Sequence, residues 1–256
     1  MATFEEEFEN FKPVIKRLTR FALLGKKVQI KGEENFVEKG PNIIVGNRIG
    51  SFKDVAALLK IVPRPIFFTA NKEIFSKEEF NALISKHLQR HLKNLSLFIE
   101  LIFSPLKFLL VNFVSTNISK VGTIPVDLVN RNIMAIKRFQ EYLKEGRAII
   151  ALQGKGRVIV KDPHPYVSPF KKGTSIIAYN LYKNGITVPV TPLAFFGTHF
   201  PYIVPKNIRV NVGRPMYIND YISGGHEEAI EEFRSALEAK VKQLFQEIIK
   251  PENGEK

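Results

Sequence analysis

Apolar and polar residues are distributed along this chain in a pattern that predicts short strands separated by longer helices. Compact apolar runs indicate strands, and apolar residues that recur every three or four positions indicate helices. Strands are predicted at 27–31, 42–46, 66–69, 122–128, 148–152, 188–194 and 208–212. Helices are predicted at 4–24, 51–60, 77–94, 131–145, 173–183 and 226–249. This alternation predicts an α/β fold with a layered mixed sheet flanked by helices.

The stretch from Asn42 to Lys60 is where we expect polar side chains to reach the end of the sheet. A buried strand leads into a turn over 47–50, and Ser51 then opens a helix. Open α/β sheets usually carry their chemistry at such strand-to-helix turns. Two interpretations fit: Ser51 and Asp54 form a capping box that satisfies the helix start, or the turn is part of a functional site.

The most apolar part of the chain, residues 95–114, is nearly long enough to span a bilayer. Glu100, Lys107 and Asn112 interrupt it, and Pro105 is expected to break it. We therefore predict no transmembrane helix but two shorter apolar helices, which are either buried or immersed in one side of a membrane.

The N-terminal segment is expected to be an amphipathic helix that Pro13 kinks or splits. It either packs on the domain or lies on a membrane surface. With 256 residues, 45% of them hydrophobic, the chain can form one large domain with an appendage. The expected organisation is an N-terminal amphipathic segment over 1–25, an α/β domain over 26–250 and a tail over 251–256.

The charge balance favours an anionic partner. Lys plus Arg number 38 against 25 Asp plus Glu, a formal net charge of +13. Nucleic acid, an anionic membrane surface and phosphorylated small molecules all fit such a charge. Most of the 21 Phe lie in apolar runs, which suits lipid or a protein core better than nucleic acid. Nucleic-acid binding is therefore the remote alternative.

Metal and cofactor chemistry is not expected. The absence of Cys excludes disulfides and thiolate metal sites. His87 and His91 lie four residues apart, but basic residues surround them, so a solvated basic helix face is the interpretation.

An acidic N-terminus without a signal pattern makes a cytoplasmic location the default.

A second candidate site follows the predicted strand 148–152. Gly154 and Gly156 alternate with the cations Lys155 and Arg157 directly after this strand. Backbone N–H groups and two cations can hold a phosphate there, although the spacing is not that of a P-loop. A plain turn is the alternative.

Five blocks of this sequence, taken in order, resemble the glycerolipid acyltransferase family, whose familiar members acylate lysophosphatidic acid. The blocks are Asn47–Asp54, Gly122–Leu128, Leu152–Arg157, Phe170–Gly173 and Val188–Ala194. The resemblance covers roughly residues 30–215. It implies transfer of a fatty acyl group from acyl-CoA or acyl-ACP to the hydroxyl of a lysophospholipid, with no further cofactor. It also implies a peripheral or monotopic protein on the cytoplasmic side of an anionic membrane.

The resemblance places the catalytic pair at Arg48 and Asp54. It implies substrate-binding roles for Asn47, Gly122, Lys155, Gly156 and Arg157. In the family the first catalytic position is a His that acts as general base and the second is an Asp that orients it. This chain has Arg48 there, and a guanidinium has no acceptor lone pair.

Three further departures concern the motifs. Five residues separate Arg48 from Asp54, where the family has four. The third block has Gln153 and Gly154 in place of its Glu, and the second has Leu128 in place of its Arg. The chain is then either an active acyltransferase whose base is another histidine, His164 or His199, or a degenerate protein that binds lipid without turnover.

Overall fold

The structure is a computed structural model that describes residues 4–50, 52–92, 96–126, 133–161, 163–201, 204 and 206–250. The chain divides into two compact units. The larger comprises residues 12–66 and 136–256, and the smaller comprises residues 1–11 and 67–135. The boundary that we predict between residues 25 and 26 is not one of these division points. The predicted tail, 251–256, lies outside the described residues.

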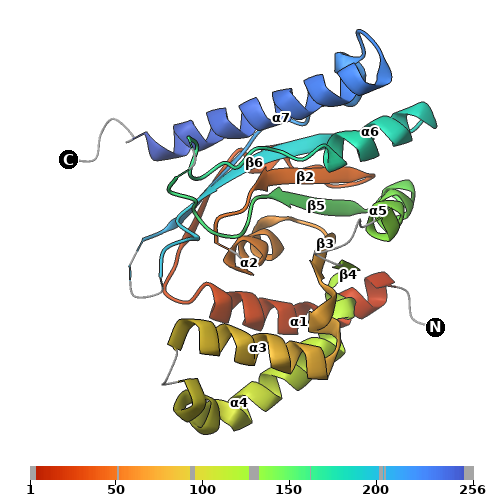
Figure 1. Ribbon diagram of the computed structural model, residues 1–256. Helices are drawn as coiled ribbons and strands as arrows, with labels where there is room; N and C mark the ends of the chain where they lie inside the picture. Colours follow the sequence, from red (N-terminus) through yellow and green to blue (C-terminus); the bar gives the residue numbers. More distant parts are fainter. Residues whose placement is uncertain are drawn as a thin grey trace. The chain divides into compact units, whose positions relative to one another are not determined.

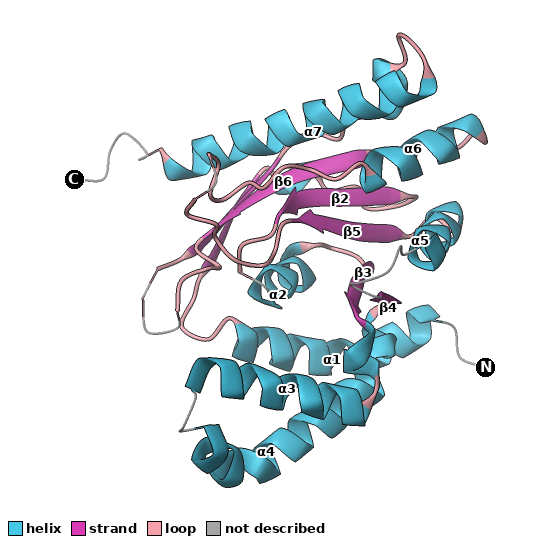
Figure 2. Cartoon of the chain, viewed as in Figure 1, coloured by secondary structure: helices cyan, strands magenta, loops and turns pink. Residues whose placement is uncertain are grey.

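The larger unit contains a mixed sheet with the strand order β1-β7-β6-β2-β5. Its strands are β1 (Val28–Lys31), β2 (Asn42–Asn47), β5 (Ala148–Gln153), β6 (Val190–Phe196) and β7 (Ile208–Val212). Strand β2 pairs in parallel with β5 and β6, whereas β6 and β7 are antiparallel (Figure 2). The predicted α/β class with a mixed sheet is confirmed.

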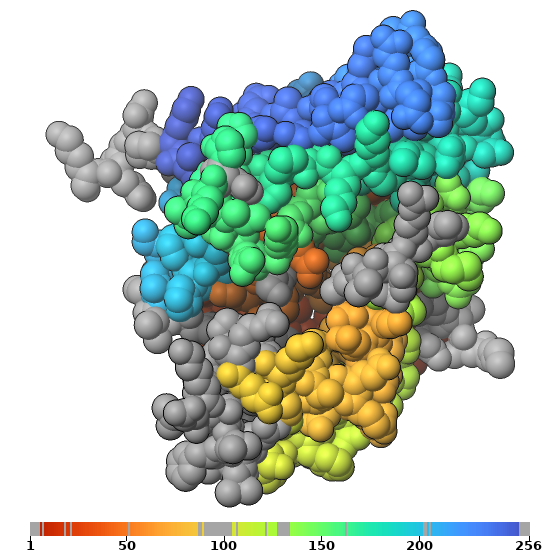
Figure 3. All heavy atoms as spheres, viewed as in Figure 1, coloured from red at the N-terminus to blue at the C-terminus, as the bar shows by residue number. Residues whose placement is uncertain are grey.

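Helices cover both faces of this sheet. Helices α6 (Gly173–Lys183) and α7 (His226–Ile249) lie along one face, and α2 (Phe52–Ile61) lies on the other (Figure 1). Figure 3 shows α7, in blue, beside the teal side chains of α6. The largest fully buried side chains of this unit come from both sheet and helices, and include Phe195, Phe233, Ile43, Leu58, Ile149 and Leu181.

The carboxyl ends of β2, β5 and β6 meet at one edge of the sheet because these three strands run parallel. The turns that follow them begin at Arg48, Gly154 and Gly197. Helix α5 (Ile133–Lys144) leads into β5, and α6 leads into β6. The fold thus brings two of the five family-like blocks to the same edge.

The smaller unit contains the parallel pair β3 (Ile66–Asn71) and β4 (Thr123–Val126) with helices α3 (Lys77–Leu92) and α4 (Ser96–Asn117). The division from the larger unit falls within β3 and also within helix α1 (Phe4–Ala22). The 3-10 turns at Lys72–Phe75 and Ile118–Val121 flank the two helices. Within the described residues, no helix combines the length and apolar character needed to cross a bilayer.

Two helix predictions need correction. Pro105 does not divide the apolar stretch, because α4 runs through it as one helix, and α1 likewise runs through Pro13. An interior proline removes one backbone hydrogen bond but leaves the turns on either side intact. Helix α4 is also bonded to α3, since Lys107 Nζ donates to Ser85 Oγ at 2.6 Å.

Candidate active site

The turns after β2 and β5 are joined through their backbones. The N–H of Arg48 donates to the carbonyl of Gln153 at 2.7 Å, and the carbonyl of Arg48 accepts from the N–H of Gly156 at 3.2 Å. Gly154 has a φ of +125°, and a Cβ there would lie 2.9 Å from the Arg48 carbonyl. The turn that begins at Arg48 and the basic turn at 153–157 are therefore bonded to each other.

Asp54 holds the turn after β2 to the start of α2. Its carboxyl group is fully buried, at 0% exposure. Oδ2 accepts from the backbone N–H groups of Ile49 at 3.0 Å and Gly50 at 2.7 Å. The predicted partner in the capping box, Ser51, lies outside the described residues. The bonds to Ile49 and Gly50 show that Asp54 fixes the turn before the helix.

Burial raises the pKa of Asp54 to about 6. The groups that favour its ionised form offset burial only in part: the Thr198 hydroxyl, the N–H groups of Gly50 and Ile49, and the charge of Arg48. Oδ1 of Asp54 and Oγ1 of Thr198 are both buried without a well-aligned hydrogen bond. The Asp54 carboxyl group is thus shared between two backbone N–H groups and the neighbouring Thr198 hydroxyl.

The loop after β6 packs directly on the turn after β2. A Cβ at Gly50 would lie 2.3 Å from the Cβ of Thr198, so only glycine permits this approach. Gly197 has a φ of +94°, and a Cβ there would lie 2.3 Å from the Asn207 carbonyl. These two glycines bring the loop that carries His199 to the edge of the sheet where Gly156 and Arg157 lie.

A cavity of ≈ 260 Å³ opens at this edge. Its lining comes from the three turns and the first turn of α2, and consists of Ile49, Gly50, Lys53, Gly156, Arg157, Val158, Thr198 and His199. Three predicted site residues, Gly156, Arg157 and His199, thus line one cavity.

His199 is half-buried among aromatic rings. Its ring centroid lies 4.1 Å from that of Phe200 and 5.4 Å from those of Tyr166 and Phe196. Burial lowers the pKa of His199, and nearby lysines lower it further. Its Nδ1 is buried without a hydrogen-bond partner. The imidazole is therefore neutral at pH 7 and can accept a proton.

His199 and Asp54 do not form a dyad. Among the described residues, no hydrogen bond or ion pair joins them, and none joins Arg48 to Asp54. Arg48 contributes its backbone to the turns, its Nε is buried without a partner, and it does not line the cavity. The residue that stands at the family spacing from Asp54, with four residues between them, is the cavity residue Ile49.

Asn47 is fully buried, and its side chain ties β2 to β6. Its Nδ2 donates to the carbonyls of Tyr166 and Phe195 at 3.0 Å each, and its Oδ1 accepts from the N–H of Phe195 at 2.7 Å. These bonds give Asn47 a positioning role, and the substrate contact that the resemblance implies for it stays a prediction.

The remaining predicted residues lie elsewhere. Lys155 is exposed in the basic turn and does not line the cavity. His164 is exposed, and it lines a separate hollow with Tyr166 and Phe245 and not the cavity beside His199. Gly122 belongs to the smaller unit, where its φ of +76° closes the Ile118–Val121 turn.

The sequence interpretation gave no role to three cavity residues, Lys53, Val158 and Thr198, of which Lys53 is the charged one. It is only 7% exposed, and its Nζ donates to the Phe200 carbonyl at 2.6 Å. Lys26 Nζ donates to the carbonyls of Pro201 and Val204 in the same loop, at 3.2 and 2.8 Å. The position of Lys53 directly before Asp54 was the one signal in the sequence that pointed to this residue.

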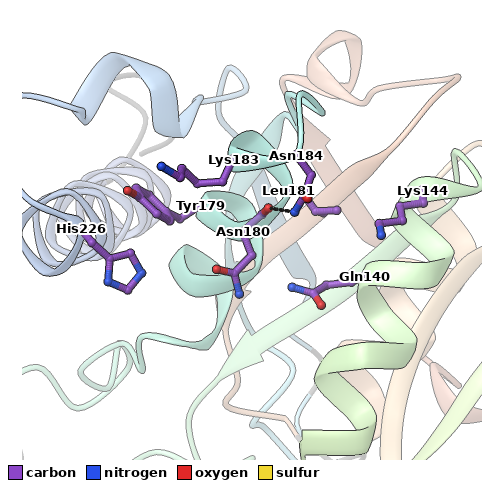
Figure 4. Close-up of a pocket in the computed structure, with 8 residues that line it drawn as sticks. All are labelled: Gln140, Lys144, Tyr179, Asn180, Leu181, Lys183, Asn184 and His226. Atoms are coloured by element: carbon purple, nitrogen blue, oxygen red, sulfur yellow. Dashed lines mark hydrogen bonds between the residues drawn. The ribbon is translucent and has the colours of Figure 1, made fainter.

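A larger hollow of ≈ 550 Å³ lies between α5, α6 and the start of α7 (Figure 4). Its lining includes Gln140, Lys144, Asn180 and His226 but no residue of the family-like blocks. In Figure 4, Gln140 and Asn180 point toward a common space beside Lys144. None of the predicted site residues lines this hollow.

Comparison with known proteins supports the fold. No family model matches this sequence, and no curated protein matches it. The structure is similar to the crystal structure of the 1-acyl-sn-glycerophosphate (LPA) acyltransferase PlsC from Thermotoga maritima, with a TM-score of 0.55 and 20% sequence identity. The match covers 96% of this chain and 81% of that chain. At this identity the similarity shows a shared acyltransferase-type fold.

Proposed function

We propose that this chain is an acyltransferase of the glycerolipid type, in which His199 acts as general base. The acceptor is a lysophosphatidic-acid-type glycerolipid, and the donor is an acyl thioester. The observation that carries the proposal is the single cavity that unites a neutral imidazole, His199, with the basic turn of Gly156 and Arg157. The acyltransferase-type fold supports it.

In this mechanism Nε2 of His199 takes the proton from the acceptor hydroxyl, since Nδ1 is the buried ring nitrogen. The hydroxyl oxygen attacks the thioester carbonyl and forms the new ester bond. The carbon–sulfur bond breaks, and the leaving thiolate recovers the proton from the imidazolium. Arg157 holds the acceptor phosphate, which places the hydroxyl near the base.

His199 is a weaker base than the histidine of the family pattern. Among the described residues no carboxylate forms an ion pair with His199, and Lys53, Lys206 and Lys26 oppose the positive charge of its imidazolium. We therefore expect slow turnover. The unpaired histidine also favours the second candidate, a protein that binds the lipid in the same cavity without acyl transfer.

We also propose that the protein acts at a membrane surface and that α4 makes the contact. Exposed large side chains are concentrated in one part of this helix: Phe108 (66% exposed), Leu109 (63%), Leu110 (47%) and Phe113 (36%). Such a cluster is costly in water and suits the apolar boundary of a bilayer.

Acyl transfer tests the proposed activity. Purified wild type, His199→Gln and His226→Gln are given lysophosphatidic acid and an acyl thioester, and the product is measured by mass spectrometry. His226 lines the hollow of Figure 4 and serves as the matched control. We expect product from wild type and His226→Gln, with at least a hundredfold loss in His199→Gln. No product from wild type would favour the lipid-binding alternative.

A further inference from the structure

We propose that Lys53 is a site of self-acylation, at which its side-chain nitrogen takes the acyl group of a thioester that enters the cavity beside His199. The inference rests on the proposed function for the identity of the thioester donor. It requires no lipid acceptor and no transfer to one, so the modification can be measured by itself.

Lys53 is a nucleophilic side chain that the proposed mechanism does not use. It lies in the first turn of α2 and lines the same cavity as His199, although it is only 7% exposed. An acylating agent in bulk solution reaches an exposed lysine such as Lys60 more readily. Preferential acylation of Lys53 would therefore show that the thioester enters the cavity.

The nitrogen of Lys53 is held at the cavity before any donor binds. Its Nζ donates to the Phe200 carbonyl at 2.6 Å. A neutral amine has two N–H donors, so it can keep this bond and still offer its lone pair. A nucleophile that is already positioned loses little further entropy when it meets a bound thioester.

The surroundings of Lys53 favour the neutral, nucleophilic form of the amine. Burial lowers the pKa of Lys53 and the charge of Lys26 lowers it further, while the charge of Asp54 opposes both. Burial next to another cation is a known way to activate a lysine as a nucleophile. After burial, the charge of Lys53 is the main cause of the lowered pKa of His199. The cavity therefore combines an activated amine with a neutral imidazole.

The proposed step balances without any further reactant. The lone pair of Lys53 Nζ forms a bond to the thioester carbonyl carbon, and the carbon–sulfur bond breaks. The imidazole of His199 takes the proton that the nitrogen loses and passes it to the departing thiolate. The products are an amide on Lys53 and a free thiol. Because an amide reacts with an alcohol far less readily than a thioester does, the acyl group stays on Lys53 and a cation is lost from the cavity.

Peptide-resolved mass spectrometry tests this proposal without any lipid. Wild type is incubated with octanoyl-CoA and digested, and the octanoyl group on each lysine is followed over time. The variants are Lys53→Arg, His199→Gln and Lys60→Arg. Lys60 lies on the same helix and is exposed, so Lys60→Arg is the matched control. Lys53→Arg keeps a cationic donor for the Phe200 carbonyl but no nucleophilic amine, and circular dichroism verifies its folding.

We expect octanoyl to appear on Lys53 at least tenfold faster than on Lys60 in folded wild type. His199→Gln should slow acylation of Lys53 at least tenfold, whereas Lys60→Arg should leave its rate unchanged. Lys53→Arg should lose the rapidly formed adduct. An excess of S-octyl-CoA, a thioether that cannot transfer its chain, should slow the reaction severalfold. Unfolding in urea should abolish the preference for Lys53.

Four results would overturn the inference: acylation of Lys53 no faster than that of Lys60, the same preference in urea, no competition by S-octyl-CoA, or an unchanged rate in His199→Gln. The two proposals fail separately. Selective acylation of Lys53 without acyl transfer to lysophosphatidic acid removes only the enzymatic proposal. Acyl transfer to lysophosphatidic acid without acylation of Lys53 removes only the self-acylation.

Discussion

Gly50 lies so close to Thr198 that a side chain at position 50 would clash with it. A Cβ at Gly50 would lie 2.3 Å from Cβ and 2.5 Å from Oγ1 of Thr198. This contact joins the turn after β2 to the loop after β6, although about 150 residues separate them in the sequence. It determines where His199 lies, since His199 is the next residue.

Gly50→Ala should displace the His199 loop. The added methyl group must push Thr198 away, and overpacking of this kind costs about 1–3 kcal/mol. We expect a lower unfolding free energy in urea and at least a tenfold loss of acyl transfer. Gly173→Ala, where a Cβ meets nothing within 4 Å, is the matched control and should leave both unchanged. Equal stability of the two variants would contradict the predicted clash.

Asp54→Asn should change how stability depends on pH. Burial raises the pKa of folded Asp54 to about 6, above the ordinary value of 3.8. The folded state therefore favours the protonated carboxyl group. The contribution of this preference to the unfolding free energy is fully present below pH 3.8 and is lost as the pH rises through about 6. By linkage the loss is roughly 3 kcal/mol at pH 7.

Asn cannot ionise, and its carbonyl oxygen can still accept from the backbone of Ile49 and Gly50. Relative to wild type, Asp54→Asn should therefore gain unfolding free energy between pH 4 and pH 8. Urea unfolding across this range measures the difference. A constant difference between the two proteins would show that Asp54 does not titrate with a raised pKa.

Ile49→His should increase acyl transfer more than Arg48→His. Ile49 lines the cavity, stands at the family spacing from Asp54, and donates its backbone N–H to Oδ2 of that carboxyl group. An imidazole there can donate to Asp54 and act as a second base. Arg48 does not line the cavity. A larger gain in Arg48→His would argue against this assignment of positions.

The exposed α4 cluster should govern membrane attachment. The double variant Phe108→Ser, Leu109→Ser removes two of the most exposed apolar side chains and should reduce flotation with anionic liposomes severalfold. Val160→Ser changes an apolar side chain that is 84% exposed on the larger unit and is the control. Equal flotation of the double variant and wild type would exclude this part of α4 as the anchor.

Much of the fold was predictable because strand and helix periodicities differ. The predicted strand 148–152 differs from β5 by one residue, and the predicted helix 226–249 coincides with α7. The prediction that Pro105 breaks the helix was wrong. Sequence alone does not show tertiary contacts of the helix, such as that of Lys107 with Ser85, that affect the free-energy cost of an interior proline.

The site was predictable only in part. Asp54 and Arg157 stand in family-like blocks, and both lie at the expected edge of the sheet. Arg48 and Lys155 do not line the cavity, because side-chain direction in a turn depends on backbone geometry that the sequence does not give. The burial of Lys53 depends on the Phe200 carbonyl, far away in the chain, so helical periodicity assigned it no role.

The central claim is that His199 is the base, and the pH dependence of kcat/KM for acyl transfer tests it most directly. The pKa of His199 is lowered from its ordinary value of 6.5. The imidazole of His199 therefore remains neutral until the pH falls below 6.5. Wild-type kcat/KM should decline only below that pH. His199→Gln should lose at least a hundredfold in rate and lack this ionisation. A His199→Gln enzyme with the wild-type rate and profile would contradict the account.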